Sequence, residues 1–208
     1  MITAVIDGHG DDYNETFISI EDCARKLIEY INEHHAGRIF ALCGLSLGAQ
    51  IVLEALSQKA DVTQNAIIES ALVLPMRSVE LLANPSYTLF YRLIKQRWFS
   101  KAQAKELLIP ENMFEDYFCN VRKMSKHSLV NIAKSNAAYS IKNTLNKAEC
   151  SALILVGSKE KSMMLNSAEK IHSVLKSSEM CILSNMKHGE FSICNPKQYT
   201  NLFLSHFA

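Results

Sequence analysis

Residues 39–56 read IFALCGLSLGAQIVLEAL, an apolar run, then a serine flanked by glycines, then apolar residues at helical spacing. The run from Ile39 to Cys43 is apolar throughout, which is typical of a strand covered on both faces of a parallel sheet. It stops at the pentapeptide GLSLG, residues 44–48, and from Ile51 onward apolar side chains return every three or four positions. The stretch therefore predicts a buried strand, a tight turn that exposes Ser46, and a helix.

The same alternation recurs along the chain. Further apolar runs that predict buried strands are Ile2–Ile6, Ala66–Ile68, Ala152–Val156 and Met180–Leu183. Amphipathic patterns between them predict helices, one ending near His35 and a last one opening with Asn195 as cap and Pro196 at its first position. This order predicts an α/β fold with a mainly parallel sheet flanked by helices.

The middle of the chain follows a different pattern. Residues 75–145 contain no convincing strand but nine of the seventeen aromatic residues, and residues 77–141 hold ten basic against five acidic side chains. We expect residues 1–74 and 146–208 to form the sheet domain and residues 75–145 to form a helical insertion. Its excess positive charge fits either ordinary solvated helix faces or a lid with a mildly cationic rim.

Composition limits the class of protein. The 208 residues, 48% apolar and 21% charged, are typical of one folded domain with a sizeable core. The longest apolar run has five residues, far fewer than the roughly 18 that a membrane-spanning helix needs. A formal charge of +1 gives no field that would attract nucleic acid or an anionic membrane. We therefore expect a cytoplasmic protein with neither kind of partner.

Cysteine and histidine spacing predicts no metal site. The six cysteines contain no CxxC pair and lie mostly in apolar runs, where cysteine behaves as a small hydrophobic residue. The one adjacent histidine pair, His34 and His35, stands where a helix is expected to end. We expect reduced cysteines, no metal and no cofactor.

A serine hydroxyl needs a base before it becomes a useful nucleophile, so a reactive Ser46 requires a histidine. Of seven histidines, His188 follows the expected strand Met180–Leu183, at the carboxyl end where parallel sheets build their sites. The alternative interpretation is that His188 is an ordinary solvent-exposed loop histidine and that residues 44–48 are a glycine-rich turn without a catalytic role. Together, Ser46 and His188 favour nucleophilic catalysis.

The imidazole also needs a carboxylate to orient it and stabilise its charged form. Glu160 is the one carboxylate in the loop GSKEK that follows the strand Ala152–Val156. Its flanking lysines also fit a solvated surface loop. Glu69, which ends the apolar run Ala66–Ile68, is the alternative acid. We expect Glu160 to be the partner of His188.

These residues resemble the α/β-hydrolase superfamily. The order Ser46, Glu160, His188 matches the family's nucleophile, acid and histidine, and Gly44–Gly48 matches its G-x-S-x-G elbow between a strand and a helix. The loop DGHGD at residues 7–11 is similar to the family's D-x-P-G-H-G-x-S loop after the fourth strand, without its proline and final serine. The helical insertion occupies the place of the family's cap. The resemblance implies a cap over Ser46 and a preference for hydrophobic acyl chains.

One family feature has no counterpart here. The resemblance implies that the backbone N–H of Leu47 is one oxyanion-hole donor, whereas the loop that gives the second donor lies upstream of the family's fourth strand, which Ile2–Ile6 matches. Residues 8–10 are the substitute available. We expect either that the native product begins upstream of Met1, or that Ile2–Ile6 pairs with Ile39–Cys43 and leaves a new sheet edge that forms a homodimer. A missing donor would lower turnover about 10²- to 10³-fold.

The sequence thus predicts a serine hydrolase of the carboxylesterase type (EC 3.1.1) that acts on a small acyl substrate. Ser46 would attack, His188 would act as base and then acid, and Glu160 would orient it. Members of the superfamily that the chain resembles also catalyse acyl transfer and C–C bond cleavage, and the sequence does not distinguish these reactions from hydrolysis. The competing interpretation is a non-catalytic or truncated hydrolase-like module that binds a small apolar ligand.

Overall fold

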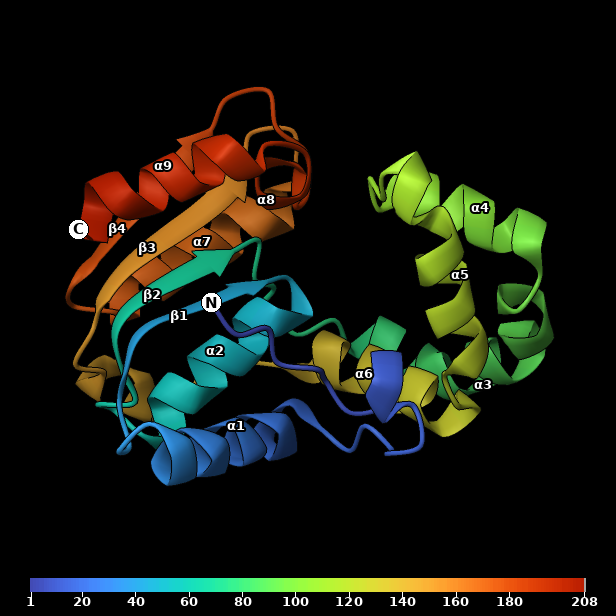
Figure 1. Cartoon of the computed structure of the whole chain (residues 1–208), viewed down its shortest axis with the longest axis horizontal. Helices are drawn as coiled ribbons and strands as arrows, with labels where there is room; N and C mark the ends of the chain where they lie inside the picture. The colour runs from blue at the N-terminus through green and yellow to red at the C-terminus, as the bar shows by residue number, and fades with distance from the viewer. Residues whose placement is uncertain (208) are drawn as a thin grey trace. The chain divides into compact units, whose positions relative to one another are not determined.

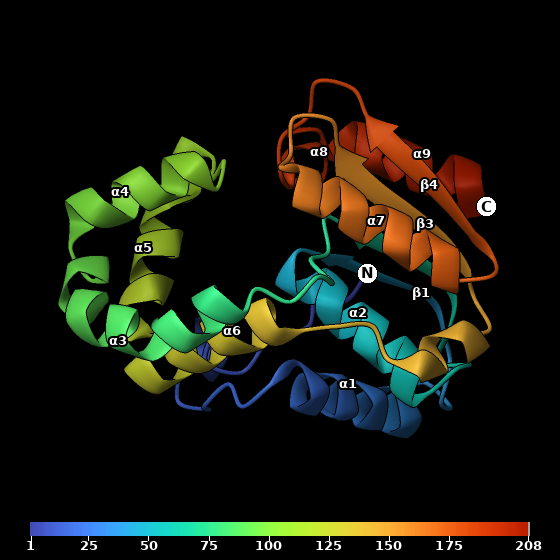
Figure 2. The same cartoon turned by 180° about the vertical axis from the view of Figure 1, so that it is seen from behind.

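The structure, a computed structural model, describes residues 1–207. The chain divides into two compact units, each described by itself. One, called the sheet unit below, contains residues 20–75 and 139–208, and the other, the helical unit, contains residues 1–19 and 76–138. Figure 1 traces both along the chain by colour, and Figure 2 gives the reverse view.

Four parallel strands form the sheet, in the order β1-β2-β3-β4. They are β1 (Ile39–Leu45), β2 (Thr63–Glu69), β3 (Ser151–Gly157) and β4 (Ser178–Leu183). The four predicted runs from Ile39 onward therefore all form strands. Their carboxyl ends lie in register, because Leu45 pairs with Glu69, Glu69 with Leu155, and Gly157 with Leu183. Loops that follow these strands consequently emerge at one edge of the sheet.

Helices cover both faces of this sheet. The helices of the sheet unit are α1 (Ile20–His34), α2 (Leu47–Gln58), α7 (Ser162–Val174), α8 (Glu190–Cys194) and α9 (Pro196–Phe207), with a short 3₁₀ helix η3 (Asn143–Lys147). Of these, α1 and η3 pack against α2. Figures 1 and 2 show α7 and α9 on opposite faces. Ile67, Leu153 and Leu155 form a buried cluster with Phe191 of α8, against which α9 packs. The central strands are consequently apolar on both sides, as the uninterrupted runs predicted.

The helical unit is built from α3 (Arg77–Ile94), α4 (Arg97–Glu106), α5 (Phe114–Lys123) and α6 (Lys126–Ala138). Short 3₁₀ turns lie at η1 (Gly10–Asp12) and η2 (Glu111–Met113). Residues 76–138 contain no strand, in agreement with the predicted helical insertion.

The prediction of a strand at Ile2–Ile6 is wrong. These residues belong to no strand in the described chain, and Ile2 and Val5 are exposed. An apolar run becomes a strand only where a neighbouring strand supplies its hydrogen bonds, and no pairing of this run with β1 occurs within residues 1–207. Residues 1–19 of the chain belong with residues 76–138 to the helical unit, whereas we expected residues 1–19 in the sheet domain.

Two contacts with α6 explain this placement of the N-terminal segment. The buried Phe17 donates its backbone N–H to Ser128 Oγ at 3.2 Å, and its carbonyl accepts from Asn131 Nδ2 at 2.9 Å. Gly8, at φ +78°, lies so close to Ser128 that a Cβ there would be 2.7 Å from Ser128 Oγ. The glycine of the expected G-H-G loop thus serves a close approach within the helical unit.

Candidate active site

Ser46 stands at the turn between β1 and α2 with a left-handed backbone, φ 53° and ψ −113°. A residue other than glycine is strained there, and such strain persists at sites where the fold holds the residue in place. Gly44 makes the turn possible, because a Cβ on it would collide with the backbone of Gly48 and come within 2.6 Å of Ala49 N. A Cβ on Gly48 would meet no atom within 4 Å, so the tight packing of the elbow depends on Gly44.

His188 lies in the loop between β4 and α8, and its Nε2 is 3.0 Å from Ser46 Oγ. This loop is held against the one that follows β3. Lys159 N donates to Met186 O at 2.9 Å, and Asn185 N donates to Ser158 Oγ at 2.9 Å. Gly157 permits that approach, since a Cβ there would collide with the Met186 carbonyl. The imidazole is therefore positioned by two strand-end loops that brace each other.

Glu160 is the carboxylate hydrogen-bonded to His188, with 2.7 Å between Oε2 and Nδ1. Its side chain is only 1% exposed. The other oxygen, Oε1, accepts hydrogen bonds from Ser70 Oγ at 2.7 Å and from the Gly157 backbone N–H at 2.8 Å. Burial would raise the pKa of Glu160, but the hydrogen bonds from His188, Gly157 and Ser70 outweigh it and lower that pKa below its ordinary value. Glu160 is thus held as an anion.

Glu69, the alternative acid, does not bond to His188. It ends β2 with 2% exposure, and its Oε1 accepts only a long bond of 3.4 Å from Ser192 N in α8. Its Oε2 is buried without a hydrogen-bond partner among the described residues. Burial raises the pKa of Glu69, partly offset by the contact with Ser192. Its contribution to the elbow comes from the backbone, whose carbonyl accepts from Ser46 N at 2.9 Å.

Ser70 is a site residue that the sequence analysis did not single out. It follows β2 directly, is 3% exposed and has φ 54°, a second left-handed non-glycine residue at this edge of the sheet. Its backbone N–H donates to Leu155 O at 2.9 Å and its hydroxyl donates to Glu160, so hydrogen bonds hold both its backbone and its side chain. The dipeptide Glu69-Ser70 carries no motif, and the available signal was only its place after a strand whose neighbours bear Ser46 and Glu160.

The expected oxyanion donors lie in different settings. Leu47 is the first residue of α2, where a backbone N–H has no acceptor one turn earlier and is free for a ligand. In the loop at residues 8–10, Gly8 N donates to Asp12 O and His9 N donates to Ile6 O, both at 3.0 Å. Two of the three amides expected to substitute for the second donor are therefore engaged within their own loop.

The described residues form neither a metal site nor a membrane-spanning helix. Over residues 1–207, no group of three or more His, Cys, Asp or Glu side chains is placed to hold a metal ion. No described helix is both long enough and apolar enough to cross a membrane.

Solved structures match the chain over nearly its whole length. An esterase from Exiguobacterium antarcticum aligns with a TM-score of 0.77 at 17% identity, over 97% of this chain and 79% of its own. A thermophilic esterase from Thermogutta terrifontis gives 0.73 at 14% identity, over 96% and 76%. A protein of Desulfitobacterium hafniense assigned to the alpha/beta hydrolase family gives 0.71 at 17% identity, over 99% and 83%. The chain has the α/β-hydrolase fold.

This result confirms the fold that the sequence predicted. No protein-family model matches the sequence. No curated protein matches it either. Within the α/β-hydrolase fold of this chain, the carboxyl ends of β1, β3 and β4 bring Ser46, Glu160 and His188 into one hydrogen-bonded row, whereas Glu69 lies beside that row without joining it.

Proposed function

We propose that this protein is a serine hydrolase that cleaves carboxylic esters of small acyl substrates. The observation that carries the proposal is the row of two short contacts, 3.0 Å from Ser46 Oγ to His188 Nε2 and 2.7 Å from His188 Nδ1 to Glu160 Oε2. Both distances lie within the range required for proton transfer to a positioned base.

In the proposed reaction, Ser46 Oγ attacks the ester carbonyl while His188 Nε2 accepts its proton. The imidazolium is stabilised by Glu160, whose lowered pKa keeps it charged. His188 then protonates the leaving alcohol, and the C–O bond breaks to give an acyl-Ser46 ester. Water attacks that ester with His188 again as base, and the carboxylic acid leaves as Ser46 is restored.

The oxyanion that forms during attack needs hydrogen-bond donors, and the Leu47 backbone N–H supports this role at the start of α2. Because the Gly8 and His9 amides donate within their own loop, we expect weak oxyanion stabilisation and slow turnover. Loss of one such donor costs about 10²- to 10³-fold in turnover in comparable enzymes. A cytoplasmic location and a cap-like role of the helical unit remain predictions from the sequence.

Covalent labelling tests the proposal. A fluorophosphonate should modify Ser46 of the intact protein, and Ser46→Ala should abolish labelling while the protein keeps its unfolding midpoint, because the change removes only a hydroxyl that bonds to the exposed His188 side chain. Ser192→Ala is the matched control, since this serine lies near the site without contacting His188. If the wild type is not labelled, the protein is better described as a non-catalytic module that binds a small apolar ligand.

A further inference from the structure

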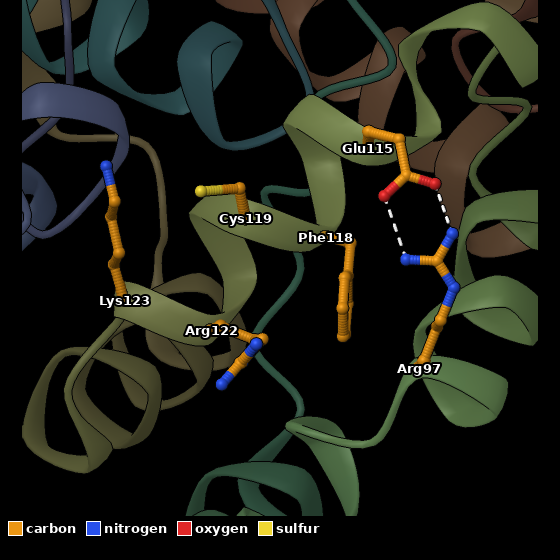
Figure 3. Close-up of a pocket in the computed structure, with 6 residues that line it drawn as sticks. All are labelled: Arg97, Glu115, Phe118, Cys119, Arg122 and Lys123. Carbon is orange, nitrogen blue, oxygen red and sulfur yellow. Dashed lines mark hydrogen bonds and ion pairs between the residues drawn. The ribbon is translucent and has the colours of Figure 1, made fainter.

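A hollow lies between α4 and α5 of the helical unit, and Figure 3 shows the side chains around it. Its volume is about 490 Å³, within the range of small-molecule sites, roughly 300–1,000 Å³. The lining residues are Arg97 of α4 and, on α5, Glu115, Phe118, Cys119, Arg122 and Lys123. At about 30 Å³ for each water-sized atom, this α4–α5 hollow has room for about sixteen non-hydrogen atoms of a small organic molecule.

The charges around the α4–α5 hollow do not balance. Its acidic lining residue, Glu115, accepts two hydrogen bonds from the Arg97 guanidinium, one of them at 2.8 Å from Nη1 to Oε2. Arg122 and Lys123 form no ion pair within residues 1–207. Lys123 Nζ lies instead over the ring of Tyr13, 5.1 Å from its centroid. Two positive charges in the wall therefore have no anionic partner among the described residues.

Aromatic contacts position the Arg122 guanidinium. Its Cζ lies 5.6 Å from the centroid of the Phe118 ring, and Arg97 Cζ lies 5.3 Å from the same centroid. Figure 3 shows Phe118 between the two arginines, and Phe118 is also stacked on Phe114 with 5.9 Å between centroids. A stacked guanidinium uses its face and keeps the N–H donors in its plane available. Arg122 is therefore held in place while its donors remain free for a ligand.

Basic residues in the last turn of a helix commonly serve its free carbonyls, and Arg122 and Lys123 are in the last turn of α5. Another residue has that role here. Lys95 Nζ donates to the carbonyls of Val121 and Arg122, both at 2.8 Å, and to that of Met124 at 2.5 Å. These bonds satisfy carbonyls that the end of a helix leaves without partners. The side chains of Arg122 and Lys123 are therefore not needed as caps.

The pKa of Lys95 shows the effect of the positive charge gathered at this end of α5. Burial lowers the pKa of Lys95 to about 8, and the nearby charge of Arg122 adds to the decrease. Such a decrease means that the two cations repel each other in the folded state. An anion bound beside Arg122 would offset this repulsion.

We propose that the α4–α5 hollow binds a small phosphate monoester, whose phosphate oxygens accept hydrogen bonds from Arg122 and whose organic group lies against Phe118 and Cys119. A phosphate monoester carries a charge of about −1.5 to −2 at pH 7, which balances Arg122 and Lys123 together. The planar fork of a guanidinium fits phosphate oxygens in a bidentate arrangement. Binding is independent of ester hydrolysis, since no lining residue belongs to the proposed catalytic row and no bond is made or broken.

Three probes that share an aromatic ring test the role of charge. Phenyl phosphate and phenyl sulfate have nearly the same shape but differ by about one charge, and benzyl alcohol is neutral. Calorimetric titration of the intact chain at low salt should give a Kd of about 1 mM for phenyl phosphate, in keeping with a small ligand in an open hollow. Phenyl sulfate should bind about threefold to fivefold more weakly, the scale of one exposed charge pair, and benzyl alcohol should not bind.

Cys119 locates the bound ligand. Among the described cysteines, Cys43, Cys119 and Cys194 are exposed, and of these Cys119 lines the hollow. Alkylation by neutral iodoacetamide is followed at each cysteine by peptide mass spectrometry. Saturating phenyl phosphate should slow alkylation of Cys119 about threefold or more, because most molecules then hold the ligand, and should leave Cys43 and Cys194 unchanged. No protection of Cys119, or equal protection of all three, would overturn the proposal.

Substitutions of Arg122 test the guanidinium itself. Arg122→Gln should weaken binding of phenyl phosphate about tenfold, since it removes charge-assisted hydrogen bonds. Arg122→Lys, which keeps the charge without the fork, should weaken it about threefold. Arg92→Gln is the matched control, because it removes the same charge from an exposed arginine of α3 that does not line the hollow.

Ser46→Ala should leave both the affinity for phenyl phosphate and the protection of Cys119 unchanged, so failure here is distinguishable from failure of the hydrolase proposal. Equal losses of affinity in Arg92→Gln and Arg122→Gln would show that the anion does not bind at Arg122. Equal affinities for the phosphate and sulfate esters would show that the hollow does not select a dianion. Either result would overturn the proposal.

Discussion

The ends of β2 and β3 each place a buried glutamate at the candidate active site, and the two carboxylates have opposite properties. Glu160, three residues beyond β3, accepts three hydrogen bonds and has a lowered pKa. Glu69, the last residue of β2, accepts one long hydrogen bond and has a raised pKa. Both carboxylates are nearly inaccessible to solvent, since the side chain of Glu160 is 1% exposed and the whole of Glu69 is 2% exposed, so the difference lies in the donors. Hydrogen bonding, rather than depth, decides which acid is held ionised.

Pleating explains why the donors are distributed in this way. Glu69 is two residues after Ile67 and shares its face of the sheet, the face covered by α8 and α9. It therefore meets Ser192 of α8 instead of the imidazole. Glu160 lies in a loop that follows the strand, where its side chain is free of that alternation and can reach both Ser70 and His188.

The largest expected effect separates the two acids by substitution. Glu160→Gln should lower kcat/KM for a short nitrophenyl ester about 10³- to 10⁴-fold, because an amide cannot stabilise the imidazolium. Glu69→Gln should lower it less than about tenfold, since that side chain does not contact His188. Steady-state assays of purified, folded variants measure both values. Similar losses in the two variants would show that the carboxylates do not have separate roles.

An intermediate effect tests the donor from β2. Ser70→Ala removes one of three hydrogen bonds to the charged form of Glu160, which raises the pKa of that carboxyl. The acid limb of the kcat/KM profile should therefore move to higher pH, and the rate at neutral pH should fall about threefold to tenfold.

Ser158→Ala is the control for this shift. Ser158 Oγ accepts from Asn185 N and so supports the histidine loop without touching the carboxylate. It should lower the rate without moving the acid limb. If both variants, or neither, move that limb, Ser70 does not act through Glu160.

The sheet was predictable because its signal is local. Uninterrupted apolar runs such as Ile39–Cys43 and Ala152–Val156 have no polar face, and this property belongs to the run itself. Ile2–Ile6 has the same composition, yet it forms no strand, because a strand also needs a neighbour and composition does not specify one. The helical segment was predictable as helical, whereas the packing of the first nineteen residues against α6 depends on Phe17 and Ser128, which lie 111 positions apart.

The residues of the candidate site also differ in whether a local signal in the sequence predicts them. Ser46 and His188 were predicted because a motif and a loop at a strand end mark them in the sequence. Glu160 was preferred to Glu69 because it lies in a loop that follows a strand, but both acids follow apolar runs and only the side-chain directions separate them in the structure. Ser70 was missed because a left-handed serine has no sequence signature and its role appears only once β2 and β3 are paired.

The smallest expected effect concerns stability and has opposite signs for the two acids. The pKa of Glu69 in the folded state is raised above its ordinary value of 4.5. Between 4.5 and this raised pKa the folded state binds more protons than the unfolded state, so the stability that Glu69 contributes falls as pH rises. The pKa of Glu160 is lowered, so its contribution is present above 4.5 and is lost as pH falls through the folded value. Urea unfolding at acidic and neutral pH measures both. Between acidic and neutral pH, the free energy of unfolding of Glu69→Gln should rise by about 1 kcal/mol relative to that of the wild type, which is the scale of one poorly satisfied buried group. The free energy of unfolding of Glu160→Gln should fall relative to that of the wild type over the same range. A change of the same sign in both variants would mean that the donors around Glu160 do not outweigh its burial.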